Sequence, residues 1–79
     1  MSEEIRAKIL QRAADLAGVD VAEINGESTL ESLGLDSSDA VILAMEVEEE
    51  TGREIDVGIF LRFEKLREAA DEIIRLLAK

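Results

Sequence analysis

Apolar residues recur every three or four positions along several segments of this chain, and this periodicity restricts its possible folds more than any other feature. Across residues 66–77 the spacing places one continuous apolar stripe along a helix. Residues 5–17 and 40–47 repeat the pattern. A strand would need apolar and polar residues in alternation, and no strand pattern of any length is present. We therefore expect an all-α protein.

Three longer helices and one short helix are predicted. The first spans residues 2–17. The second begins at Asp36, whose carboxylate can cap the free amides of its first turn, and it ends at Gly52. A short helix is expected within residues 55–63, and the last helix runs from about residue 64 to residue 77. Together they predict a four-helix bundle.

A long connection, residues 19–35, separates the first two predicted helices. It is too apolar for a free linker, so we expect an ordered loop that is pinned to the core, with a helical turn around residues 29–33. The residues expected to anchor it are Val21, Ile24, Leu30, Leu33 and Leu35.

The chain is short and lacks two residue types on which many active sites depend. Its 79 residues fit one domain, residues 1–79, with a thin core. Without cysteine or histidine it has no disulfide, no thiolate or imidazole metal ligand, and no histidine base. An EF-hand calcium loop over residues 20–31 fails, because Ala22 and Ile24 occupy ligand positions. We expect neither an enzyme nor a metal site.

The net charge is −10, and its position is informative. No basic residue occurs between Arg12 and Arg53, so the excess of acids lies entirely in this window. Such charge argues against nucleic acid as a partner and predicts a surface that attracts basic proteins. The longest apolar run, residues 40–45, is far shorter than the roughly 20 residues that span a bilayer. No signal peptide is recognisable, so we expect a cytoplasmic monomer without a membrane span.

One short segment carries a candidate chemical group. Ser37 follows the capping residue Asp36 and so falls in the first turn of the second predicted helix. Free amides and the helix dipole make this end favourable for an anion, such as a phosphate esterified to the serine. The run Asp36–Asp39 is equally an ordinary capping cluster, and these residues alone leave both interpretations open.

A series of features occurs in a fixed order over about residues 5–77. They are the run Thr29–Ser37, Asp39, Val41, Met45, the acidic run Glu48–Glu50, the pair Glu54–Ile55, and Leu66, Ala69, Ala70 and Ile73 in the last predicted helix. In these features the chain resembles the acyl carrier proteins, small acidic helical bundles that carry acyl groups as thioesters on a 4'-phosphopantetheine arm attached to a serine.

The resemblance implies that Ser37 is the attachment site of 4'-phosphopantetheine. A phosphopantetheinyl transferase would transfer the arm from coenzyme A, and the working thiol would belong to the arm, which accounts for the missing cysteine. The chain would be a free-standing carrier that serves fatty-acid, polyketide or other specialised acyl biosynthesis.

The resemblance also implies a docking surface for acyl-transferring, condensing or modifying enzymes with basic patches. Acids would form weak, salt-sensitive pairs with those patches, and three apolar residues would supply the centre of the contact. A core position is the alternative for each of the three, and it is more plausible for Val41 than for Ile42 or Met45. The predicted docking residues are Asp36, Ser38, Asp39, Val41, Ile42, Met45, Glu46, Glu48 and Glu49.

Four positions depart from the family pattern. Ser38 replaces a leucine or methionine, Ile42 a glutamate, Thr51 an aromatic residue and Asp56 a proline. These departures favour a carrier dedicated to one pathway, and a hydrophobic cargo is expected between the second helix and residues 59–63. A peptidyl or aminoacyl carrier, or an unmodified acidic interaction module, remains an alternative.

Overall fold

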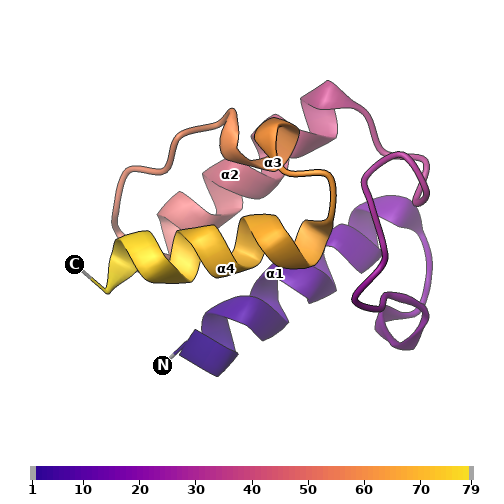
Figure 1. Ribbon diagram of the computed structural model, residues 1–79, viewed down its shortest axis with the longest axis horizontal. Helices are drawn as coiled ribbons and strands as arrows, with labels where there is room; N and C mark the ends of the chain where they lie inside the picture. The colour runs from indigo at the N-terminus through magenta and orange to yellow at the C-terminus, as the bar shows by residue number, and fades with distance from the viewer. Residues whose placement is uncertain (1, 79) are drawn as a thin grey trace.

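The computed structural model describes residues 2–78 and contains four α-helices and one short 3-10 helix (Figure 1). Their bounds are α1 Ser2–Ala17, η1 Val21–Glu23, α2 Ser37–Thr51, α3 Ile59–Arg62 and α4 Leu66–Leu77. Within the described residues there is no strand, and no helix is long and apolar enough to cross a membrane. The prediction of an all-α bundle with three longer helices and one short helix is confirmed.

The core is built from all four helices. α1 packs against both α2 and α4, and the short α3 bridges α2 and α4 on the other side (Figure 1). Each helix contributes one large, fully buried side chain, namely Ile9, Leu43, Ile59 and Ile73. Ile9, Leu43 and Ile73 lie on the apolar stripes that the periodicity predicted, whereas Ile59 lies in the short segment for which no stripe was predicted.

The bounds of α2 follow from its capping residues. Asp36 Oδ1 accepts hydrogen bonds from the amides of Ser38 at 3.0 Å and Asp39 at 3.2 Å, and Asp39 Oδ2 accepts one from the Asp36 amide at 3.0 Å. This capping box fixes the start of the helix. At the other end Gly52 has a φ of +68°, a left-handed conformation that favours glycine, and closes the helix as predicted.

α4 begins later than predicted, at Leu66 instead of residue 64. Lys65 has an extended backbone and forms an isolated antiparallel bridge with Thr29 of the distant loop. The Leu66 amide donates to the Ser28 carbonyl oxygen at 2.9 Å. This non-local pairing holds Lys65 extended, so that the first helical turn begins only at Leu66.

The loop between α1 and α2 is ordered, as predicted. Ile24 and Leu35 are buried, and Leu30 and Leu33 are partly buried against the core. Val21, by contrast, is exposed, so its predicted anchoring role is wrong. The expected turn consists of amide donations from Leu33 to Thr29 and Leu30, which close one turn without continuing into a helix.

Candidate functional site

Ser37 is the first residue of α2, and its side chain is exposed. Its hydroxyl group has no hydrogen-bond partner within residues 2–78 of the structure. The neighbouring Ser38 differs, because its hydroxyl donates to Asp36 Oδ1 at 2.7 Å. The Ser38 hydroxyl is therefore bonded to the carboxylate that caps the helix, whereas the Ser37 hydroxyl is free and faces solvent.

The electrostatics at this helix end come from Asp36 and the backbone. The hydrogen bond from the Ser38 hydroxyl, followed by that from the Asp39 amide, holds the pKa of Asp36 below its ordinary value. Asp36 therefore remains a carboxylate at neutral pH. The positive end of the α2 dipole faces the same space, which favours an anion on Ser37 despite the nearby carboxylate.

A groove of about 290 Å³ opens beside Ser37. One side is formed by the loop before α2, and the other by α3 and the residues after it. Its apolar lining is provided by Leu30, Leu35, Phe60, Leu61 and Phe63. Polar residues, among them Thr29, Glu31 and Glu64, complete the lining. A space of this size with a mixed lining can accommodate an elongated organic group that is attached at the serine.

The groove does not coincide with the cargo site that the sequence predicted. It lies between the preceding loop and α3, whereas the predicted cargo site lies between the second helix and residues 59–63 and stays a prediction. Ser37 is the only α2 residue that lines it. Leu30 and Leu35 were missed as lining residues, although their apolar character within a polar loop was the signal that could have identified them.

The outward face of α2 presents three apolar side chains. Val41, Ile42 and Met45 are 37%, 41% and 56% exposed. Val41 therefore does not take the core position that the sequence left open as its alternative, and its docking role stays a prediction. Ser38 and Glu49 lie on the same outward side of the helix, since successive residues turn by about 100°.

The predicted docking acids do not form one uniform group. Glu46 lies toward α1, with its carboxylate 3.4 Å from the Arg12 guanidinium. Glu48 lies toward the α2–α3 connection, where Oε2 accepts a hydrogen bond from the Ile55 amide at 2.8 Å. Glu49 is exposed and has no partner in the described part of the chain. The structure thus separates acids with intramolecular partners from one without.

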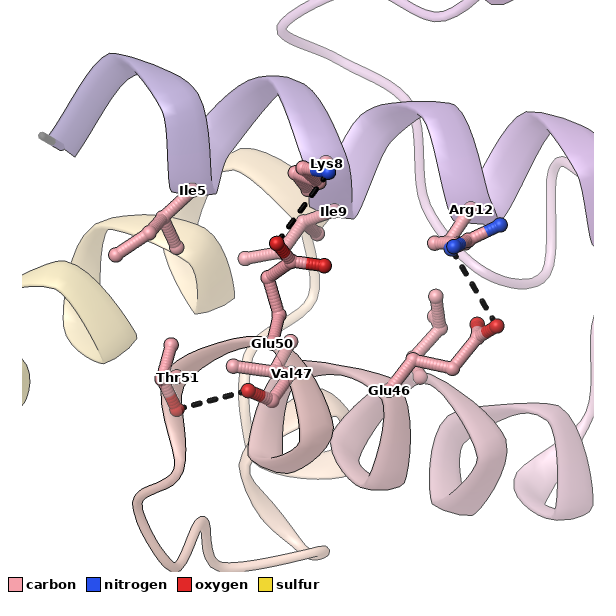
Figure 2. A pocket seen from close by; sticks show the side chains of 9 residues that line it. Ile5, Lys8, Ile9, Arg12, Glu46, Val47, Glu50 and Thr51 are labelled. Carbon is pink, nitrogen blue, oxygen red and sulfur yellow. Dashed lines mark hydrogen bonds and ion pairs between the residues drawn. The ribbon is translucent and has the colours of Figure 1, made fainter.

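A second crevice, between α1 and α2, is a poor candidate for a binding site (Figure 2). Its free volume is about 10 Å³, enough for about one water molecule. Two ion pairs join the helices across it, Lys8 with Glu50 at 3.3 Å and Arg12 with Glu46. We therefore treat the crevice as a packing seam of the bundle.

Comparisons with known proteins agree with this geometry. Residues 7–73 match the family described as "Phosphopantetheine attachment site". The chain is also similar to the acyl carrier protein of Rubrobacter xylanophilus, with 40% identity over 73 residues that cover 91% of this chain and 90% of that protein. The exposed serine, the positive helix end and the adjacent groove fit an elongated prosthetic group that is joined through a phosphate.

Proposed function

Since the chain belongs to the acyl carrier protein family, we propose that Ser37 carries its 4'-phosphopantetheine and that the chain delivers thioester-bound acyl groups to partner enzymes. Proteins of this family are carriers and not enzymes. The prosthetic group supplies the thiol that the chain lacks. Residues 1–79 would act as one cytoplasmic carrier domain.

The observation that carries this proposal is the difference between the two serines at the start of α2. An attached phosphate requires a hydroxyl that a transferase can reach without breaking the fold. Ser37 satisfies this requirement, because its hydroxyl is exposed and unpartnered in the part of the chain that the structure describes. The Ser38 hydroxyl is committed to the Asp36 carboxylate at the helix cap.

The test is intact-mass spectrometry of the apo protein after incubation with coenzyme A, magnesium and a broad-specificity phosphopantetheinyl transferase. The wild type should gain the mass of one phosphopantetheine, and Ser37→Ala should gain none. Ser38→Ala is the matched control and should still be modified. The proposal would be refuted by modification of Ser37→Ala at the same rate, or by no gain in the wild type with several transferases.

The groove beside Ser37 is the proposed location of an attached hydrophobic cargo. Leu30 and Leu35 face Phe60 and Leu61 across it, within reach of a group that begins at the serine. Loading with an octanoyl group should shift the NMR signals of these four residues. Shifts confined to Ser37 and its immediate neighbours would contradict this location.

The exposed face of α2 is the proposed docking surface for partner enzymes. Val41, Ile42 and Met45 would form its apolar centre, and Glu49 would offer a carboxylate that is not engaged within the described chain. Asp36, Ser38, Asp39 and Glu46 would lie at its edges. Met45→Ala should weaken binding to a modifying transferase at any ionic strength, whereas Glu49→Gln should do so mainly at low salt.

The departures from the family pattern support a carrier dedicated to a specialised acyl pathway, of fatty-acid or polyketide type. Ile42 is 41% exposed, so the apolar residue that replaces the usual glutamate lies on the docking face itself. Partners should therefore bind through a more apolar patch than a general fatty-acid carrier offers. Ile42→Glu should improve loading by a general fatty-acid transferase, and an unchanged loading rate would count against specialisation.

A further inference from the structure

The connection between α2 and α3, residues 52–58, is held by carboxylate groups that accept backbone hydrogen bonds. Glu48 Oε2 accepts from the Ile55 amide at 2.8 Å, across seven residues of chain. Asp56 Oδ1 accepts from the Gly58 amide at 2.9 Å, just before α3 begins. These bonds fix a segment that has no regular secondary structure of its own.

Loss of the hydrogen bond between Glu48 and the Ile55 amide should lower the stability of the protein, because this amide is buried. Ile55 is 6% exposed and belongs to the core, and Glu48 is half-buried. A backbone amide that is removed from water needs an acceptor, and no other acceptor is recorded for this one within the described residues. Glu48 is therefore the group that keeps Ile55 in its buried position.

The same bond reaches the groove beside Ser37 through α3. Ile55 is followed after three residues by α3, whose Phe60 and Leu61 form one wall of the groove. α3 is only four residues long, and Gly58, the residue that precedes it, provides no side-chain cap. Its position therefore depends on buried side chains and on how the preceding connection is held.

We propose that Glu48 is a positioning residue, which sets the α3 wall of the groove by holding the Ile55 amide, whereas the docking charge proposed above lies on its neighbour Glu49. The two adjacent acids then have separate tasks. Glu48 acts through the reach of its side chain, and Glu49 acts through its free charge. The part of this inference that concerns the groove and the partners rests on the proposed carrier function.

Two conservative substitutions distinguish the length of the Glu48 side chain from its charge. Glu48→Gln loses the charge but keeps an oxygen at the same distance, whereas Glu48→Asp keeps the charge but is one methylene shorter. The measurement is amide hydrogen exchange at Ile55 in the apo protein, followed by NMR. Glu49→Gln and Glu49→Asp are matched controls, because they make the same changes one residue further along the helix.

A positioning role predicts that Glu48→Asp accelerates exchange at Ile55 on the order of tenfold to a hundredfold, the effect of losing a bond to a charged acceptor. Glu48→Gln should retain most of the protection, and both Glu49 variants should match the wild type. In Glu48→Asp, the signals of Phe60 and Leu61 should also shift. Faster exchange in Glu48→Gln with none in Glu48→Asp would overturn the proposal, as would equal acceleration in the Glu48 and Glu49 variants.

The division of tasks has a second readout. Binding of a hexa-arginine peptide should weaken in Glu49→Gln by severalfold and should change less in Glu48→Gln. The reverse order would overturn the assignment of the docking charge to Glu49. These measurements use unmodified protein, so their outcome is independent of whether Ser37 accepts phosphopantetheine.

Discussion

Stability of this protein should depend strongly on ionic strength, because ten excess negative charges are confined to a small volume. The net charge is −10 and the radius of gyration is 11.2 Å, which corresponds to a sphere of about 14 Å radius. Unfolding lets the charges separate, since an unfolded chain of this length has a radius of gyration of about 27 Å. Added salt therefore lowers the repulsion energy of the folded state by more than it lowers that of the unfolded state.

The magnitude follows from Coulomb's law with Debye screening. Spread over the folded sphere, the charges repel by about 10 kcal/mol at 0.01 M salt and by about 6 kcal/mol at 0.1 M. For the unfolded chain the corresponding values are about 3 and about 1 kcal/mol. The folded state therefore gains about 2–3 kcal/mol relative to the unfolded state over this range of salt. Exposed ion pairs such as Lys8–Glu50 weaken with salt, but by only a few tenths of a kcal/mol each.

The assay is thermal unfolding followed by circular dichroism at 0.01 M and 0.1 M sodium chloride. For a domain of this size the melting temperature should rise by roughly 10–20 °C. A control variant, Glu23→Gln with Glu31→Gln, neutralises two exposed loop acids; because repulsion scales with the square of the charge, the rise should shrink by about a third. A melting temperature that is indifferent to salt, or an equal rise in the control variant, would refute the reasoning.

Three further outcomes are expected. Gly52→Ala should lower the free energy of unfolding, measured in urea, by about 1–2 kcal/mol, because an alanine is strained at a φ of +68° although no neighbouring atom blocks its Cβ. An unchanged free energy of unfolding would show that the end of the helix relaxes without cost. Ile59→Val, at a fully buried position, should cost about 0.5–1.5 kcal/mol by the same method, and a stabilisation would contradict the described core. The lowered pKa of Asp36 contributes stability at pH values above the unfolded-state pKa of about 3.9, and this stability is lost as the pH falls through the folded-state pKa. Acid titrations should therefore show a smaller loss in Asp36→Asn, and an acid transition identical to that of the wild type would remove Asp36 from the explanation.

The sequence was sufficient to predict the fold wherever local rules decide the structure. The apolar periodicity located α1, α2 and α4, and the cap at Asp36 and the glycine at Gly52 bounded α2 because a capping box and a left-handed residue act within one turn. The start of α4 was not predictable in the same way. It depends on pairing between Lys65 and Thr29, which lie far apart in the sequence.

The site was predictable in its chemistry and less so in its details. The resemblance identified Ser37 as the attachment residue, which stays a prediction, and periodicity alone could not decide whether Val41 faces the core. The roles of Glu46 and Glu48 depend on Arg12 and on the Ile55 amide, which are contributed by other elements of the bundle. A run of acids looks uniform in sequence, but the fold gives its members different hydrogen-bond and ion-pair partners.

The pairing of Thr29 with Lys65 also has a consequence for the order of folding. The loop that makes this bridge contributes only two buried apolar side chains, Ile24 and Leu35, whereas the helices provide most of the buried core. Segments with few buried apolar contacts open at lower free energy than the core. We expect the long loop to dock last and to detach first. Native-state hydrogen exchange should reveal this as opening of the Leu66 amide at lower free energy than the amides around Ile9 and Leu43. The residues that lead to Ser37 would then be the part of the carrier that remains adaptable after the helices have assembled.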